Sequence, residues 1–487
     1  MLDKLPSELL QEIFSLVHLK EHRALRLACK SLNDSITPIL LQTVSINLNY
    51  EKTFHASILL LRALGSSQNN PGKFVKCLRI HSSFDPPCEN YRHLWHRVVR
   101  KRRRVVCRIE KLILDALPSL ISLRSIEFCF YHTSELSVSA LDSIMCRISA
   151  LPRLDTLTLH AYSHDYPMKH QQQFFSYFHH LRDITITGQM IDAIPHIIAK
   201  SPGLFRLRLV STEPVTNLHS VLDLFPLLPP AFRCSVEQLT LEGNFTLPQP
   251  DIVPVIPHLR HLTSLRLLIH DISDAFWTAL SVESIHVKEI SVDIGSDALL
   301  DYLCSYSGIT MMMLIVDRGV IEAGALKFWN QVLPRHANTM KRLYVHSQSA
   351  GMWCIDSGPL RCLMQCTNLE ILSVVVDRQR ADIDGPGNIV TRVLGTLGIW
   401  KHMDLICFLS TCQLNEDMGN PITTRHTDPE RIHDLISAFQ CRQPTDNMHH
   451  IMVESDLARY MLGSVPTEPD IFSFLVTRSH ALKIRRP

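Results

Sequence analysis

The chain has 487 residues, of which 46% are hydrophobic and 20% are charged, so it can bury large cores and is not a disordered chain. The 49 basic and 47 acidic side chains leave a formal charge of +2, which argues against attraction of the whole surface to nucleic acid or to a membrane. No apolar run approaches the ~18–20 residues of a membrane span, and the early acids of the first residues leave no room for the core of a signal peptide.

Residues 1–48 predict a small all-α unit. Pro6 suits the first turn of a helix, and a single apolar stripe follows in the order Leu9, Leu10, Ile13, Phe14 and Val17. A second apolar pattern lies between basic residues, and a last short helix is predicted to begin at Thr37-Pro38. Three short helices give only a marginal core, so this unit is expected to need a partner or a flanking domain.

The same segment resembles an F-box in two consecutive motifs. Residues 5–14 read LPSELLQEIF and residues 25–33 read LRLACKSLN, in the order and spacing of that family, although Leu32 stands where many members have an aromatic residue. The resemblance implies docking to the Skp-type adaptor of a Skp–cullin–F-box ubiquitin ligase. The residues it assigns to the adaptor contact and the fold beneath it are Leu5, Pro6, Leu9, Leu10, Ile13, Phe14, Leu25, Leu27, Cys29 and Leu32. The alternative is an amphipathic N-terminal helix packed on the rest of the chain, which spacing alone does not separate from an F-box.

A strand motif of the form LxxLxL recurs from residue 75 onward. Its fourth position returns every 23 to 32 residues between Ile126 and Leu372. The predicted strands are 75–80, 123–128, 154–159, 181–186, 204–209, 236–241, 262–267, 287–292, 311–316, 340–345 and 369–374. The intervals between them carry helical periodicity, for example at Leu141, Ile144, Met145 and Ile148.

Repeated units of strand, helix and parallel strand predict a curved α/β solenoid over residues 49–376. The pattern resembles leucine-rich repeats of the irregular kind that follows an F-box in many ubiquitin-ligase receptors, although most units lack the family's asparagine after the strand. A doubly wound sheet would need glycine-rich turns at a ligand site, and the chain has 17 glycines and no GxGxxG. The predicted class is therefore α/β: a short all-α F-box followed by a leucine-rich-repeat-like solenoid.

A basic helical insert interrupts the repeats at residues 85–117. Its run RKRRR at 100–104 is typical of a nuclear import signal or of a patch for an acidic partner, and also of a solvated helix face. No basic stripe with interleaved aromatic residues continues elsewhere, which argues against a nucleic-acid partner. Residues 377–487 predict a C-terminal repeat or capping region with a loop at 413–429 and a helix at 431–439.

No motif indicates catalysis, a cofactor or a metal. GxSxG, HExxH, GxxxxGK(S/T) and the kinase motifs are all absent from the sequence. Cys362 and Cys366 have a helical spacing that metal ligands can use, but further ligands at a defined spacing are missing, so we expect them in the core. The 14 cysteines include no CxxC pair and lie mostly among apolar residues, which indicates a reducing compartment, the cytoplasm or the nucleus.

The residues between the leucines of each strand are predicted to face the open, concave side. Arginine and tyrosine are typical anchors of binding surfaces, so the expected client contacts, toward an acidic or phosphorylated segment, are Arg206, Arg208, Arg266, Arg342 and Tyr344. An ordinary solvent-facing strand surface explains these residues equally well. The leading hypothesis is a non-enzymatic substrate receptor that binds the adaptor, through it a cullin, and an unknown protein client. The alternative is a repeat scaffold that acts outside a ubiquitin ligase.

Overall fold

The computed structural model describes most of the chain with its side chains. The described residues are 7–17, 21, 24–25, 27–47, 54–66, 71–83, 107–131, 138–161, 175, 177–188, 194–212, 218–225, 234–247, 252–294, 296–316, 322–347, 350–377, 387–410, 427–441, 451–456, 458–465 and 468–479. The chain divides into two compact units. Unit 1 comprises 1–246 with 257–259, and unit 2 comprises 247–256 with 260–487.

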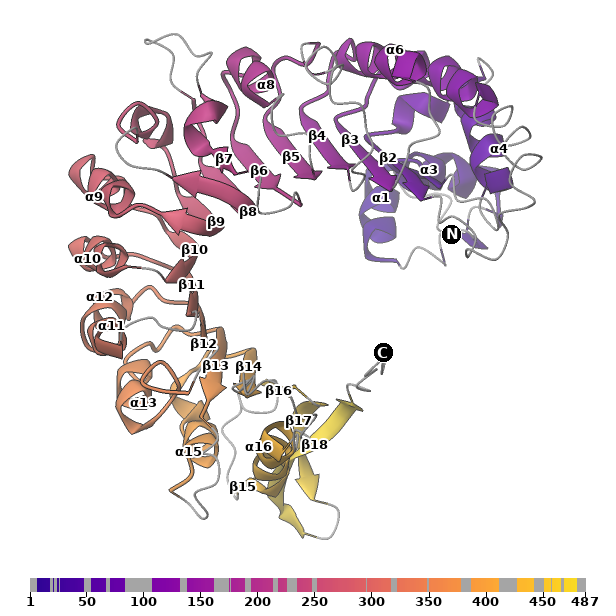
Figure 1. The fold of residues 1–487 in the computed structure, drawn as a ribbon. Helices are drawn as coiled ribbons and strands as arrows, with labels where there is room; N and C mark the ends of the chain where they lie inside the picture. Colours follow the sequence, from indigo (N-terminus) through magenta and orange to yellow (C-terminus); the bar gives the residue numbers. More distant parts are fainter. Residues whose placement is uncertain are drawn as a thin grey trace, which may run out of the picture. The chain divides into compact units, whose positions relative to one another are not determined.

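Unit 1 begins with helices and continues as a sheet (Figure 1). Its helices are α1 (Ser7–Leu16), α3 (Lys30–Leu40), α4 (Phe54–Gly65), α6 (Val138–Ser149) and α8 (Ile194–Lys200), with a further helix at 107–116. Short 3-10 turns are η2 (Pro71–Phe74), η4 (Leu117–Ser119), η7 (Val221–Leu224) and η8 (Ile256–Leu259). Its strands are β1 (Thr43–Asn47), β2 (Cys77–Ser83), β3 (Ser125–Tyr131), β4 (Thr156–Ala161), β5 (Asp183–Gly188), β6 (Arg206–Val210), β7 (His219–Ser220) and β8 (Gln238–Leu247).

The strands of unit 1 pair in parallel in sequence order. The order is β1–β2–β3–β4–β5–β6–β8, and β7 pairs with the far end of β8. The same backbone contact joins each strand to the next: the carbonyl just before β3, that of Arg124, accepts from the N–H groups of Asp155 and Thr156. The same pair of hydrogen bonds is found at each successive strand from Gln42 to Phe205. The repeat predicted from the sequence is therefore also present in the backbone hydrogen bonding.

Unit 2 continues the pattern and ends in an antiparallel region. Its parallel order is β9 (Ser264–Ile272), β10 (Glu289–Ile294), β11 (Met311–Val316), β12 (Arg342–Ser347), β13 (Ile371–Val376), β14 (Leu405–Ser410) and β16 (Met452–Ser455). β16 pairs antiparallel with β17 (Ala458–Val465), β17 with β18 (Glu468–Ser479), and β18 with β15 (Gln440–Cys441). Its helical segments are α9 (Asp274–Val282), α10 (Asp297–Ser305), α11 (Glu322–Lys327), the π-helix η9 (Phe328–Val332), α12 (Leu333–His336), α13 (Ser357–Leu363), α15 (Ile389–Gly395), η10 (Leu397–Ile399) and α16 (Thr427–Ala438).

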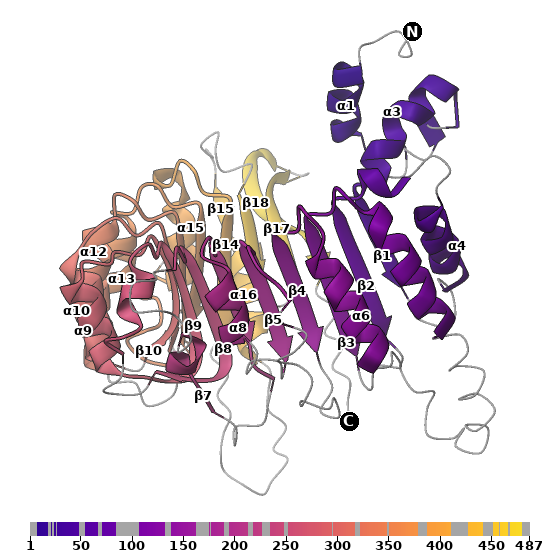
Figure 2. The same cartoon turned by 90° about the horizontal axis from the view of Figure 1, so that it is seen from above.

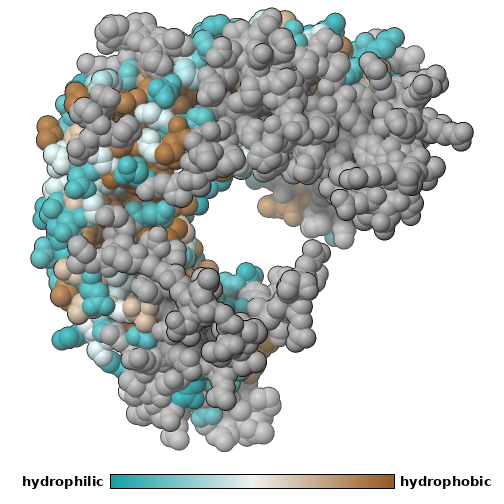
Figure 3. Space-filling view, viewed as in Figure 1, coloured by the Kyte–Doolittle hydropathy of each residue, from teal (hydrophilic) through white to brown (hydrophobic). Residues whose placement is uncertain are grey.

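In each unit the helices cover one face of the parallel strands and leave the other face open, as Figures 1 and 2 show. The motif leucines point to the helices and are buried, whereas the residues between them are exposed or half-buried, as in the alternating pattern of β6. Each unit therefore has a core of inward strand residues under its helices. The outer surface over α9 to α13 mixes hydrophilic and hydrophobic residues (Figure 3). Val282 of α9 and Leu326 of α11 are exposed.

Each predicted strand overlaps an observed strand, but all except 311–316 begin two residues later than predicted. Three other predictions differ from the structure or lie partly outside the described residues. Thr37 and Pro38 do not begin a helix but lie inside α3, which continues because Ile36, Ile39 and Leu40 pack on the N-terminal core. The basic run 100–104 lies outside the described residues, and of the insert only 107–116 and the following turn are described. α16 begins at Thr427, inside the range predicted as a loop, whose part before that residue is also outside the described residues.

Candidate functional site

Helix α1 presents apolar side chains in two directions. Leu10 and Phe14 are buried with Leu32 and Ile36 of α3, and Leu25, Ile39 and Leu40 pack at the edge of this cluster. Leu9, Ile13 and Leu16 lie on another side of the helix and are exposed by 47%, 36% and 85%. At ~100° per residue the exposed stripe is centred roughly 110° away from the buried pair. One stripe thus holds the small core together, and the other is left uncovered.

The remaining residues of the N-terminal prediction fall into three groups. Leu5 and Pro6 lie outside the described residues. Leu25 is half-buried and Leu32 is buried, so both belong to the core cluster. Leu27, exposed by 83%, and Cys29, exposed just before α3, face outward.

The open face of unit 1 is polar. Three rows of side chains cross it, because the parallel register aligns equivalent positions of successive strands. The middle row consists of Ser45, Arg79, Glu127, Thr158, Thr185, Arg208 and Thr240. Such a surface offers hydrogen-bonding groups and charges at regular spacing, with few apolar groups.

The arginines of this face already have acidic partners. Arg206 donates from Nη1 to Asp183 Oδ2 at 2.9 Å and from Nε to Gln238 Oε1 at 2.7 Å. Arg208 Nη2 lies 3.4 Å from Glu242 Oε1. Burial raises the pKa of the Asp183 carboxyl, and Arg206 opposes that shift. Both predicted client contacts of this unit are therefore exposed but neutralised by neighbouring strands.

The open face of unit 2 is more apolar than that of unit 1, although β9, β10 and β12 also carry polar side chains such as Ser291. Its half-buried outward side chains include Leu268, Met311, Met313, Ile315, Ile371, Leu405, Leu409 and Met452. Three of the predicted client contacts lie here: Arg266 on β9, and Arg342 and Tyr344 on β12, all half-buried. Tyr344 aligns with Met313 on one side and Ser373 on the other. The two units thus divide the predicted contacts, with two residues in unit 1 and three in unit 2.

Charge on the open face of unit 2 is internally balanced. Arg342 Nη2 lies 2.8 Å from Glu289 Oε1, and since both residues align with Met311 of the strand between them, the pair passes over that methionine. Burial lowers the pKa of His346, whose ring bonds to Ser373 Oγ at 2.9 Å, and burial raises the pKa of the Cys407 thiol to about 11. Both groups are thereby kept in their neutral forms at pH 7.

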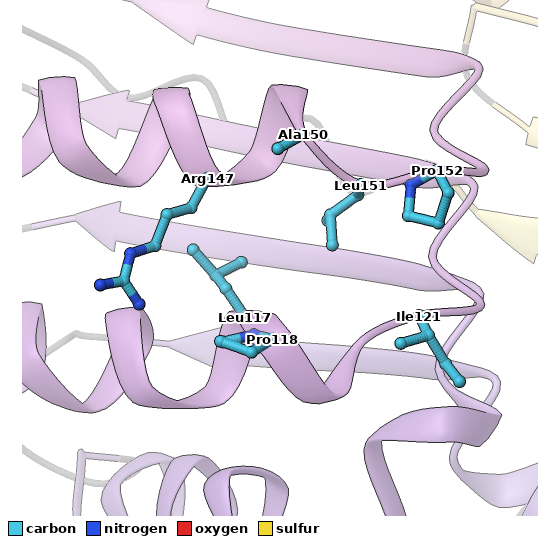
Figure 4. Close-up of a pocket in the computed structure, with 7 residues that line it drawn as sticks. All are labelled: Leu117, Pro118, Ile121, Arg147, Ala150, Leu151 and Pro152. Carbon is cyan, nitrogen blue, oxygen red and sulfur yellow. The ribbon is translucent and has the colours of Figure 1, made fainter.

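A pocket of about 410 Å³ lies on the helix-covered side of unit 1 (Figure 4). It is lined by Leu117, Pro118, Ile121, Arg147, Ala150, Leu151 and Pro152. Its one charged group, the Arg147 guanidinium, donates to the carbonyl of Leu114 at 2.9 Å. The pocket therefore lacks the converging polar groups of a ligand site and is a gap between successive repeats.

Among the described residues, one cluster has the side chains of a metal site: His81, Glu127 and Cys129 on the open face of unit 1. Cys362 and Cys366, both expected in the core, differ in burial: Cys366 is buried, whereas Cys362 is half-buried. Burial raises the pKa of the Cys366 thiol to about 12. Both the cluster and the apolar face of unit 2 were missed from the sequence. The alternation of Met311, Met313 and Ile315 with the buried residues of β11 was the available signal for the apolar face.

The N-terminal segment can now be assigned to a domain family. The family model of the F-box domain matches residues 2–39, which contain α1 and nearly all of α3. The chain thus contains an F-box domain at its N-terminal end, and F-box domains typically bind Skp-type adaptors. A search of curated proteins gives no match for the chain. In the part of the chain that the structure describes, no helix has the length and apolarity required to cross a membrane.

Proposed function

We propose that this protein is the substrate-recognition subunit of a Skp–cullin–F-box type ubiquitin ligase. The observation that carries the proposal is the exposed stripe of Leu9, Ile13 and Leu16 on a helix whose other apolar side is packed. Apolar anchors at this helical spacing are what a helix inserts into a groove of a partner. Leu27 and Cys29 extend the adaptor contact, and Leu10, Phe14, Leu25 and Leu32 hold its shape from beneath.

The repeats serve as the client-binding part in this proposal. Parallel strands in sequence order, helices on one face and a repeated backbone contact support a curved leucine-rich-repeat-like solenoid. The open faces would hold an unidentified protein client near the ubiquitin-loaded conjugating enzyme, so the contribution of this chain to ubiquitin transfer is proximity. F-box proteins are generally non-catalytic adaptors, which agrees with this role. The cytoplasm or the nucleus is the proposed location.

Arg206, Arg208, Arg266, Arg342 and Tyr344 remain the proposed client contacts. Arg206, Arg208 and Arg342 are held by carboxylates of neighbouring strands, so an acidic or phosphorylated client has to replace those carboxylates. A phosphate group, with more charge and three acceptor oxygens, competes better than a carboxylate. This favours a client whose recognition depends on phosphorylation.

Adaptor co-purification tests the proposal. The double variant Leu9→Asp and Ile13→Asp places two charges on the exposed stripe and is expected to weaken adaptor binding at least ~100-fold, since two anchors of about 2 kcal/mol each are removed. Leu59→Asp is the matched control, because Leu59 of α4 is exposed by 50% outside the F-box and its change should leave adaptor binding intact. Circular dichroism of all chains reports whether the fold is retained.

The possible outcomes separate the two functions under consideration. Retention of the adaptor by the parent and by the Leu59→Asp chain, with loss in the double variant, supports the receptor. If the parent binds no adaptor, the alternative, a non-catalytic repeat scaffold outside a ubiquitin ligase, replaces it. Equal adaptor binding by the parent and the double variant would place the contact on another surface.

A further inference from the structure

Three side chains of metal-ligand type meet on the open face of unit 1, outside every contact assigned above. They are His81 of β2 and Glu127 and Cys129 of β3, and their ligand atoms all lie within 4.8 Å of one another. The parallel register sets His81 directly beside Cys129. Glu127 stands two residues earlier on β3 and therefore faces the same side of the sheet.

We propose that His81, Glu127 and Cys129 bind a zinc ion. Imidazole nitrogen, thiolate sulfur and carboxylate oxygen are the three donor types that Zn²⁺ takes in proteins. Magnesium and calcium prefer sites made only of oxygen, so the nitrogen and sulfur donors select against them. The site is independent of the proposed receptor function, because it rests on neither the adaptor contact nor a client.

The spacing of the three donors is close to that of a tetrahedral site. Zinc bonds of about 2.0–2.3 Å in a tetrahedral site place neighbouring ligand atoms about 3.3–3.8 Å apart. Cys129 Sγ already lies 3.7 Å from Glu127 Oε1, and the widest separation in the group, 4.8 Å at most, closes by side-chain rotation. Three protein ligands leave a fourth position for water. On the next strand, His160 of β4 aligns with Cys129.

The two carboxylate oxygens of Glu127 have different partners, which leaves one oxygen next to the proposed zinc position. Its Oε1 accepts from the Cys129 thiol, whereas its Oε2 pairs with Arg79 Nε at 3.0 Å. Zinc binding forms the Zn–S bond, releases the thiol proton to solvent and takes the place of that proton beside Oε1. Arg79 keeps its contact with Oε2 and orients the carboxylate.

Burial gives the site a protected sulfur and an open entrance. Cys129 is 2% exposed, whereas His81 and Glu127 are half-buried and reach the open face. A bound ion links β2 to β3, which are otherwise joined here by backbone hydrogen bonds and by the ion pair of Arg79 and Glu127. Zinc would therefore stabilise unit 1 and add a cationic centre to a face whose arginines are already neutralised.

Zinc and cobalt titrations of the full chain test the site. After treatment with a chelator, zinc affinity is measured by competition with a chromogenic chelator, and Co²⁺ is added separately to record its absorption spectrum. We expect one ion per chain, a thiolate-to-cobalt charge-transfer band, and at least a tenfold loss of zinc affinity in Cys129→Ser, His81→Ala and Glu127→Gln. Cys77→Ser is the matched control, because Cys77 is a half-buried cysteine on β2 and the same open face, and its affinity should equal that of the parent.

Several results would overturn the proposal. These are no zinc binding by the parent, a cobalt spectrum without the thiolate band, or zinc affinity that is unchanged in both Cys129→Ser and His81→Ala. If Cys129→Ser does not fold, His81→Ala decides the question, since His81 is half-buried and its truncation leaves the strand core intact. If zinc affinity is lost in Cys77→Ser but not in Cys129→Ser, zinc binds at Cys77 and the proposed site is rejected.

Discussion

The open faces of the two units share one backbone pattern and differ in chemistry. In unit 1 the outward positions of the parallel strands carry threonine, serine and paired charges, as at Thr158, Thr185 and Arg208. In unit 2 many of the equivalent positions carry apolar residues such as Met311, Met313 and Ile371, which are half-buried, although Ser291 and Arg342 also lie on this face. The buried rows beneath are alike, with aliphatic side chains from each strand in both units.

This difference shows which positions specify the fold and which are available for recognition. The inward residues are constrained in both units because they must fill the space beneath the helices. The outward residues carry no such requirement, so a change of chemistry between units indicates a change in what each face contacts. Under the proposed receptor function, polar groups of a client would meet unit 1 and apolar groups would meet unit 2.

Truncation of core side chains should lower the free energy of unfolding more than any other change, and by similar amounts in the two units. Leu209→Ala in unit 1 and Leu314→Ala in unit 2 each remove a side chain that is 0% exposed, and each is expected to cost about 2–5 kcal/mol of unfolding free energy. Urea unfolding with hydrogen exchange would report the loss and its location. Leu218→Ala and Leu326→Ala, at positions exposed by 53% and 51%, are controls expected to cost less than about 0.5 kcal/mol. A core cost below 1 kcal/mol in one unit would mean that its repeats are loosely packed.

Acid should weaken unit 2 through a buried histidine. His336 is 1% exposed, its Nε2 donates to Leu303 O at 3.0 Å, its Nδ1 accepts from Ile309 N–H at 3.3 Å, and burial lowers its pKa to about 4. The unfolded chain binds this proton near pH 6.5 and the folded chain only near pH 4, so stability is full above 6.5 and falls as the pH drops toward 4. The expected loss is about 2 kcal/mol at pH 5 relative to pH 7.5.

The pH prediction is checked by urea unfolding at both pH values. His336→Gln should lower stability at pH 7.5 and reduce its dependence on pH, whereas His261→Gln, at an exposed position, should preserve both. An unchanged pH dependence in His336→Gln would assign the acid sensitivity to other groups.

The strands were predictable because the buried residues of each strand occupy the same positions of a short sequence motif in every repeat. Leu207 and Leu209 of β6 are as buried as their alternation requires, and the same holds for Leu343 and Val345 of β12. The antiparallel pairing of β17 with β18 was not predictable. The repeat motif predicts parallel strands only, and these two strands do not follow it. The continuation of α3 through Pro38 was also missed, because tertiary packing of Ile36 outweighed the local signal for a new helix.

The candidate sites were predictable only in part, for a reason of geometry. A sequence pattern identifies an apolar stripe on α1, but only the position of α3 separates buried Phe14 from exposed Leu9. The partners of the arginines come from other repeats, as Glu289 does for Arg342 from 53 residues away. His81 and Cys129 are likewise separate in sequence and meet only through strand register. Residues that meet across strands leave no signal in local spacing.

Truncation of one outward residue in each unit sharpens the comparison between the faces. Met313→Ala removes a half-buried side chain between Ser291 and Tyr344, and a loss of about 1 kcal/mol is expected. Thr185→Ala, in the corresponding row of unit 1, should change stability by no more than about 0.5 kcal/mol. Urea unfolding measures both. Equal small effects would show that the apolar face of unit 2 contributes nothing to the stability of the free chain.

Breaking the ion pairs of the open faces should have the smallest effect on stability. Dye binding to the same variants distinguishes the open face of unit 1 from that of unit 2. Arg206→Ala and Arg342→Ala each break a partly exposed pair, with arginine side chains exposed by 46% and 39%, so each should cost at most about 1 kcal/mol, less at high salt. Only the pair of Arg342 passes over an apolar side chain, Met311. Binding of a hydrophobic fluorescent dye should therefore rise in Arg342→Ala and stay at the parent level in Arg206→Ala. A rise in both chains would mean that the face of unit 1 also conceals apolar surface, and the division between a polar and an apolar face would no longer hold.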